Sequence, residues 1–255
     1  MSLAEIREAD AAPDLAAVYA GLRQGVGVAQ VNLIWRHAAA LPGVLDWLWA
    51  QARPVLASGA AAGARDRIAA RVAPPALGRM AVPAGVADLV ETYNRGNLTN
   101  LAVLTAIRLR MDGVAAEAPG PVAPVGAMLP VPPPLPRLGD LPADVAARVR
   151  GLAARHGLSD ASVVPSLYLH LATWPEVLAA VPALLAPLAL AEARDGAVAA
   201  AEAEAPGLIG SLGPAPPPPP GLDDFLPTLR LFTREVIPAM VPVGLSLHRA
   251  FAKGA

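Results

Sequence analysis

Apolar residues in this chain recur at three- and four-residue spacing, which is the period of one face of an α-helix. A clear example is the stripe Val90, Tyr93, Asn97, Leu101 and Leu104. A second helix start is indicated by TWPE at residues 173–176, which has the form of a capping box with a proline in the first turn. Period-two alternation of β-branched residues, which would indicate strands, is scarce. The pattern therefore predicts an all-α fold.

The stripe has a counterpart near the C-terminus. At an offset of 139 residues, Tyr93 matches Phe232, Arg95 matches Arg234 and Leu101 matches Met240, while Val236 stands where the first stripe has Asn97. At an offset of 133 residues the pairs are Trp35 and Tyr168, His37 and His170, Pro42 and Pro175, Val44 and Val177, Leu45 and Leu178, and Pro54 and Pro187. One difference in loop length explains the two offsets. We predict an internal duplication of about 130 residues, with residues 1–114 and 143–255 as helical pseudo-repeats packed on each other.

Residues 115–142, between the two pseudo-repeats, are dense in proline. Proline without a period favours an extended, polyproline-type linker over a packed helix. Within this linker the run PPPLPR resembles an SH3 ligand but lacks the PxxPxR spacing. A protein-interaction module that uses its prolines is therefore one alternative function.

Composition narrows the functional classes. The chain has 255 residues, 55% hydrophobic and 16% charged, which is enough to bury a sizeable core. Its net charge of −1, with Lys253 as the only lysine, lacks the basic footprint of a nucleic-acid-binding protein. The absence of cysteine excludes disulfides and thiolate chemistry.

A mean hydropathy of +0.46 raises the question of a membrane. The apolar run Val177–Ala191 is interrupted by two prolines and is shorter than the roughly 20 residues that a spanning helix needs. The acidic N-terminal segment has no secretory pattern. We expect a cytoplasmic protein with neither membrane nor nucleic-acid partners.

Three asparagines at a spacing of three, Asn94, Asn97 and Asn100, concentrate amides in an otherwise apolar region. A buried carboxamide without partners costs about 1–3 kcal/mol, so Asn97 needs something to satisfy it. One explanation is a binding site. The alternatives are a hydrogen bond from Asn97 to a nearby backbone carbonyl, or a helix break at Gly96 that Asn97 caps.

Other candidate chemistry is sparse. The chain has no Walker loop, no GxSxG, no GxGxxG with an acidic partner and no HExxH, so we expect neither cofactor nor metal. His37 and His170 occupy matching positions on apolar helices, and we interpret them as core histidines bonded within their own halves rather than as a ligand pair. Arg36, Arg95 and Arg108 are candidate partners for a carboxylate, and the sequence does not choose among them.

The segments YNRGNLTNLAVLTA, before the linker, and ATWPEVL, in the second half, resemble the DL-2-haloacid dehalogenases that act on both enantiomers. The resemblance implies an all-α fold of two pseudo-repeats, usually dimeric. It also implies direct displacement of halide from a 2-haloacid by an activated water, with no ester intermediate and no metal. The family's essential Asn corresponds to Asn97, where its carboxamide would position the water or the substrate.

The family's other essential residue is an Asp that acts as general base, seven residues before the Trp of the TWP motif. In this chain that position is Leu167, and leucine cannot accept a proton. Asp160 is the nearest upstream carboxylate and a candidate substitute base, although a helix N-cap after Ser159 is an alternative role for it.

The resemblance further places Ser166, Leu167, Tyr168 and Asn94 at the substrate. Two functions follow as alternatives. One is a haloacid dehalogenase-like hydrolase with lost or altered activity. The other is a non-catalytic relative that binds small organic acids or keeps only the fold.

Overall fold

Helices dominate the computed structural model, which describes residues 3–75 and 77–253. The helices of the first half are η1 (Glu8–Asp10), α1 (Pro13–Val26), α2 (Leu33–Ala39), α3 (Val44–Ala57), α4 (Ala60–Val72) and α5 (Ala84–Met111). Those that follow are η2 (Leu138–Asp140), α6 (Ala143–Ala154), α7 (Ser166–Leu171), α8 (Pro175–Leu184), α9 (Leu190–Ile209), α10 (Leu222–Leu231), a π-helical turn η3 (Phe232–Val236) and α11 (Ile237–Ala250). The all-α prediction is confirmed.

One small pairing of strands was not predicted. Strand β1 (Met80–Val82) pairs in parallel with β2 (Phe251–Lys253), in the register Met80 to Phe251. The pairing joins the entry to α5 to the end of α11. Among the described residues, no helix is both long and apolar enough to cross a membrane.

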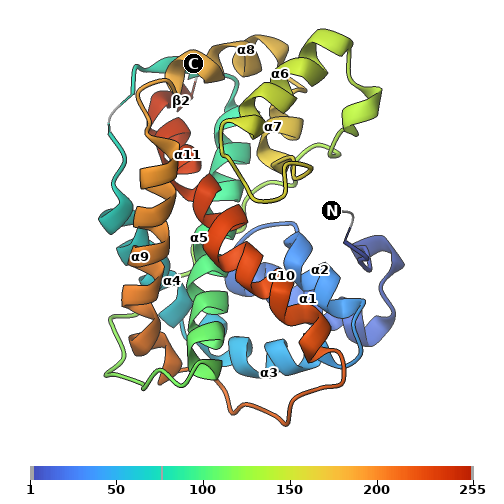
Figure 1. Cartoon of the computed structure of the whole chain (residues 1–255), viewed down its shortest axis with the longest axis vertical. Coiled ribbons are helices and arrows are strands. Elements are labelled where there is room, and N and C mark those ends of the chain that lie inside the picture. Colours follow the sequence, from blue (N-terminus) through green and yellow to red (C-terminus); the bar gives the residue numbers. More distant parts are fainter. Residues whose placement is uncertain (1–2, 76, 254–255) are drawn as a thin grey trace.

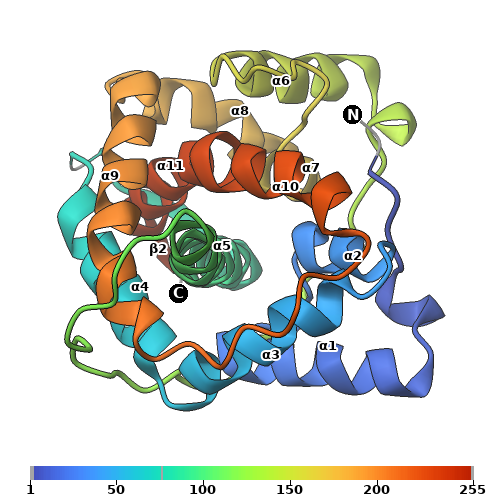
Figure 2. The same cartoon turned by 60° about the horizontal axis from the view of Figure 1, so that its bottom comes forward.

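Two hydrophobic cores are arranged along the long helices α5 and α11, which lie against each other and against α9 (Figure 1). Figure 2 shows α5 end-on, with the other helices around it. The C-terminal part of α5, from Leu98 to Ile107, packs with α1–α4 and α9–α10 in the first core. Its N-terminal part, with Val86 and Val90, packs with α6–α8 in the second core. The long helix of the first half therefore completes a core that is formed mainly by the second half.

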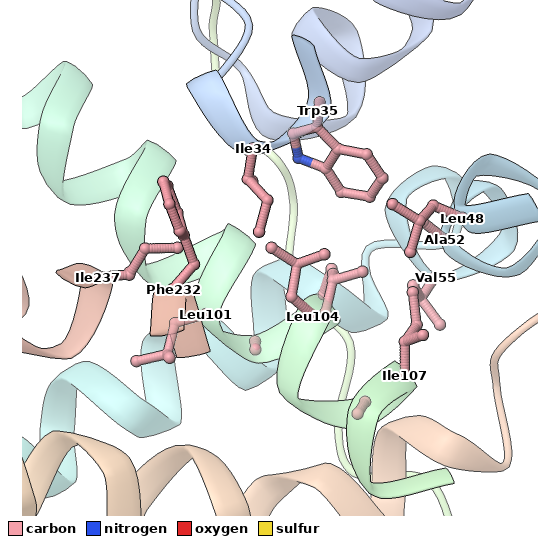
Figure 3. Packing of buried hydrophobic residues seen from close by; sticks show 14 of the residues in the cluster. Ile34, Trp35, Leu48, Ala52, Val55, Leu101, Leu104, Ile107, Phe232 and Ile237 are labelled. Carbon is pink, nitrogen blue, oxygen red and sulfur yellow. The ribbon is translucent and has the colours of Figure 1, made fainter. Parts of the chain in front are cut away.

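The first core is closed by large side chains from several helices. Trp35 on α2 and Leu48 on α3 are almost fully buried, and they converge on Leu104 of α5 (Figure 3). Phe232 and Ile237, at the junction of α10 and α11, reach the same cluster from the other half of the chain. Burying a side chain of this size contributes about 1.5–3 kcal/mol, so the halves are held together by apolar packing.

The linker 115–142 runs extended over the surface apart from η2. Backbone bonds attach it to the body, including Ala123 N–H to Gly59 O at 3.1 Å and Leu129 N–H to Gly27 O at 3.2 Å. It lies so close to α4 that a Cβ at Gly63 would be 2.0 Å from the Pro121 carbonyl oxygen. The extended form follows from proline's fixed φ and missing N–H.

The predicted capping box at 173–176 is wrong. Helix α8 begins at Pro175 as expected for a proline in the first turn, but its N-cap is Trp174, and no side chain caps it. The Thr173 N–H bonds to the His170 carbonyl at 3.0 Å. Thr173 stands one residue before the N-cap of α8, outside the position from which its side chain was expected to cap the helix.

The predicted duplication agrees with the order of helices, since α2, α3, α4 and α5 are followed in the same order by α7, α8, α9 and the α10–α11 pair. The superposition of the halves, and the division at residues 114 and 143, stay predictions. Superposed coordinates should place His37 on His170 and Pro42 on Pro175.

Candidate functional site

A cavity of about 310 Å³ lies where the two halves meet. Ligand sites in proteins typically span about 300–1,000 Å³, so this volume suits a small molecule. Its lining comes from the α1–α2 connection, α2, α5, the loop before α7, α7 itself and the α10–α11 junction. The apolar part of the lining is Leu3, Val31, Leu33, Leu135, Val163, Val164, Pro165, Leu167, Leu231, Phe232, Val236 and Ile237.

Residues separated by the offsets of 133 and 139 line this cavity from opposite halves. They are Val31 and Val164, Asn32 and Pro165, Leu33 and Ser166, Tyr93 and Phe232, and Asn97 and Val236. In three of these pairs the first half supplies a polar side chain and the second half an apolar one. The first half therefore supplies more of the polar lining at these positions, and we call the region around Tyr93, Asn97 and His170 the polar side of the cavity.

The polar side contains a chain of hydrogen bonds between Tyr93 on α5 and His170 on α7. The Tyr93 hydroxyl lies 2.7 Å from His170 Nδ1, and His170 Nε2 lies 2.9 Å from the Pro133 carbonyl oxygen. A carbonyl only accepts, so Nε2 carries the proton. Nδ1 of the neutral ring is then an acceptor, and the Tyr93 hydroxyl donates to it.

Burial keeps both groups of this chain uncharged. It raises the pKa of Tyr93 above its ordinary value, and the nearby Gln30, Ser166 and Arg36 side chains offset this only in part. Burial also lowers the pKa of His170, against a smaller opposing effect of its bond to Pro133. At neutral pH the chain therefore consists of a protonated phenol and a neutral imidazole.

Arg36 is the one arginine among the described residues that line the cavity. Its helix, α2, is capped by Asn32, whose Oδ1 accepts the Ile34 N–H at 3.2 Å. Arg36 Nε lies 3.1 Å from Glu5 Oε2, at an angle too bent for a hydrogen bond. A guanidinium has five N–H donors, so the ion pair leaves most of them for a ligand.

The three asparagines of α5 have three different environments. Asn100 Oδ1 accepts the Trp35 indole N–H at 2.7 Å in the first core. Asn94 is buried against α11, where a Cβ at Gly244 would be 2.2 Å from its Oδ1. Asn97 is half-buried and lines both the cavity and an adjoining chamber of about 30 Å³. The helix runs through Gly96 without a break, which excludes the capping role for Asn97.

No protein-family model and no curated protein matches the chain. Solved structures do match. A structure described as a D-2-halacid dehalogenase mutant superposes with a TM-score of 0.79 at 16% identity, over 98% of this chain and 96% of that one.

Two related structures agree with the first. A D-2-haloacid dehalogenase in complex with L-LA gives a TM-score of 0.74 at 17% identity, over 97% of this chain and 95% of the other. A D-2-haloacid dehalogenase mutant in complex with D-2-CPA gives a TM-score of 0.71 at 18% identity, over 98% of this chain and 93% of the other. The chain has the fold of the D-2-haloacid dehalogenases. The all-α fold expected from the resemblance is thereby confirmed, and the two pseudo-repeats stay a prediction.

Within this dehalogenase fold, the residues expected at the substrate are dispersed. Leu167 and Ser166 line the cavity, Leu167 with 1% of its surface exposed. Tyr168 is fully buried in the second core, and its hydroxyl lies 2.8 Å from His156 Nε2. Neither Tyr168 nor Asn94 is among the residues that line the cavity.

Asp160 lines a separate hollow beside α6. Its Oδ1 accepts hydrogen bonds from the Ser162 N–H at 2.9 Å and the Ser162 hydroxyl at 2.6 Å. The loop at 161–164 lies between this hollow and the cavity, since Val163 and Val164 line both. The geometry gives no support to Asp160 as a base.

The other candidate arginines are engaged elsewhere. Arg95 Nη1 donates to the carbonyls of Gly27 at 3.1 Å and Ala127 at 2.6 Å, holding the linker. Arg108 is buried and pairs with Glu202 at 2.6 Å.

Sequence reasoning missed Tyr93 and His170 as site residues. It treated Tyr93 as part of an apolar stripe, and it expected His170 to bond within its own half, whereas its partner Tyr93 comes from the other half. The available signal was the phenol of Tyr93 one turn before Asn97; nothing local in the sequence linked it to His170.

Proposed function

We propose that this protein binds short 2-substituted carboxylic acids in the cavity between its halves, and that it does not release halide from 2-haloacids. One observation carries the proposal: Arg36 and a mostly apolar wall line the cavity, and no Asp or Glu is among its described lining residues. The fold shared with D-2-haloacid dehalogenases supports the same class of ligand.

The arrangement suits the two ends of such an acid. The guanidinium of Arg36 can pair with a carboxylate through two parallel N–H donors. Phe232, Val236 and Ile237 provide an apolar surface for the short alkyl part. The carboxamide of Asn97 lies at the polar side, where it can bond a substituent on C2.

Displacement of halide by water needs a group that accepts a proton as the water attacks. Leu167 cannot, and the Nδ1 lone pair of His170 is already used by the Tyr93 hydroxyl. Burial raises the pKa of Tyr93, so its phenolate is not available either. A positioned base contributes about 10²–10⁴-fold, and this cavity lacks that contribution.

Calorimetric titration of the purified protein tests binding. Propionate and both enantiomers of 2-chloropropionate should bind, and Arg36→Gln should weaken every one of them about tenfold or more, as expected for a lost charge-assisted pair. The matched control is Arg53→Gln, which makes the same chemical change at an exposed arginine outside the cavity. Equal affinity in the wild type and Arg36→Gln would refute Arg36 as the carboxylate partner.

A halide electrode tests the chemistry. The wild type should release no halide from either enantiomer of 2-chloropropionate above background. Leu167→Asp introduces a carboxylate at the family position and is the variant in which turnover should first appear, although burial will raise the pKa of that new side chain. Halide release by the wild type, abolished by Asn97→Ala, would show that the protein is a hydrolase with a base elsewhere.

A further inference from the structure

The donor-to-acceptor direction of the hydrogen bonds at the polar side of the cavity is fixed by a backbone carbonyl of the linker. It starts at the Pro133 carbonyl of the linker, which can only accept, and runs through His170 to the Tyr93 hydroxyl. Each member donates its one available proton toward the linker. The Tyr93 oxygen is therefore left with lone pairs and no proton for a ligand.

Two neighbours of the Tyr93 hydroxyl do not reverse this polarity. Gln30 and Ser166 lie close enough to influence its ionisation, and both line the cavity. A serine hydroxyl has one proton. If Ser166 donates it to the Tyr93 oxygen, the serine oxygen then presents lone pairs to the cavity in turn, and the chain still ends in an acceptor. A Gln30 NH₂ group that donates one N–H to Tyr93 keeps its second N–H and its carbonyl oxygen, so Gln30 itself can either donate or accept, while the Tyr93 oxygen still has no proton to give.

We infer that this cavity selects carboxylic acids that carry a hydrogen-bond donor on C2, of which 2-hydroxy acids are the simplest, over 2-halo and 2-oxo acids. The inference rests on the proposed function, since it names which of the short acids the same cavity prefers. Tyr93 is its specificity-determining residue, and His170 is the positioning residue that holds the Tyr93 proton away from the ligand.

The preference follows from what each ligand does to the Tyr93 oxygen. A hydroxyl on C2 can donate to it, whereas a chlorine or a keto oxygen offers only lone pairs and leaves two acceptors facing each other. A net hydrogen bond contributes roughly 0.5–1.5 kcal/mol, which corresponds to about tenfold in affinity at the upper end. Sites built to pair a ligand hydroxyl discriminate more strongly when fully closed.

The test is calorimetric titration with four probes: L-lactate, D-lactate, 2-chloropropionate and pyruvate. The affinity for each probe is expressed relative to the affinity for propionate. In the wild type at least one lactate enantiomer should bind about tenfold more tightly than 2-chloropropionate or pyruvate. Tyr93→Phe keeps the ring and removes the oxygen, so the lactate preference should fall to within about twofold.

A second variant distinguishes polarity from simple loss of packing. His170→Leu removes the acceptor of the Tyr93 proton, which frees that hydroxyl to donate into the cavity. The affinity for pyruvate should therefore rise relative to the affinity for lactate. A purely structural role for His170 would weaken all four probes by the same factor.

The outcomes separate the two proposals. Equal affinities for lactate, 2-chloropropionate and pyruvate in the wild type, with propionate still bound, would overturn the selectivity and leave the proposed function standing. Failure of every acid to bind would overturn the proposed function itself. If His170→Leu does not fold, Tyr93→Phe alone decides the inference.

Discussion

Acidification should destabilise this protein through one buried histidine. His156, just after α6, is 4% exposed, and its Nδ1 has no hydrogen-bond partner among the described residues. Its Nε2 lies 2.8 Å from the Tyr168 hydroxyl. Burial, with smaller contributions from Arg155 and Arg194, lowers the pKa of His156 from 6.5 to about 4.

The sign follows from proton binding. Between pH 6.5 and 4 the unfolded chain binds a proton at this residue that the folded protein does not. The stability is therefore fully present above pH 6.5 and is lost as the pH falls. At pH 5 the loss amounts to about 2 kcal/mol, and the whole difference between the two pKa values corresponds to about 3 kcal/mol. Domains of this kind are stable by only about 5–15 kcal/mol, so the effect is large.

Urea unfolding at pH 8 and pH 5 measures this loss of stability, with the His156→Gln variant as the comparison. The Gln amide reaches toward Tyr168 as Nε2 does, but it does not titrate. The free energy of unfolding of the wild type relative to this variant should fall by about 2 kcal/mol between the two pH values. Other titrating groups are present in both proteins and cancel in the difference.

Tyr168→Phe is the control for the cause. It removes the hydrogen bond but leaves His156 buried, so the acid sensitivity should persist in a protein that is less stable at both pH values. If the difference between the wild type and His156→Gln is the same at pH 8 and pH 5, burial of His156 does not govern its protonation and the reasoning is refuted.

Four further substitutions test the crossing of the long helices, the first core and the cavity. Gly244→Ala should lower the free energy of unfolding by about 1–3 kcal/mol because its Cβ would meet Asn94. In urea unfolding, adding Asn94→Ala should recover most of this loss. Strictly additive effects of the two substitutions would contradict the close contact. Asn100→Ala should cost about 1–3 kcal/mol by leaving the Trp35 indole N–H unpaired, and an unchanged unfolding midpoint would exclude that bond. Asn97→Val should keep its melting temperature, since the matching position in the second half carries valine, but should weaken acid binding in calorimetry; unchanged affinity would remove Asn97 from the site.

Local patterns were sufficient for the fold and for part of the site. The stripe around Asn97 lies on one continuous helix, because apolar residues at helical spacing specify both the helix and its buried face. Asn97 does line the cavity, although it is half-buried rather than mostly buried as the stripe suggested. An open cavity takes the place of a packed neighbour at this position.

The remaining site residues depended on contacts between segments far apart in the chain. Tyr93 and His170 are 77 residues apart and meet only because α5 packs against α7. The selection of Arg36 over Arg95 and Arg108 depends on where the linker and α9 supply other partners. No local spacing encodes such pairings, so they emerge only from the assembled structure.

The sharing of α5 by both cores also limits how the protein can move. Enzymes that close on a ligand by hinge motion bend at a few loop or element-terminal residues between rigid bodies. Here the connection between the two cores is the interior of a 28-residue helix, reinforced by α11 alongside it. Bending it would disrupt backbone hydrogen bonds at the very turn that carries Asn97. Any movement that adapts the cavity to a ligand must therefore come from its wall, from the loop before α7 and the linker around Leu135, while the helices behind them stay stiff.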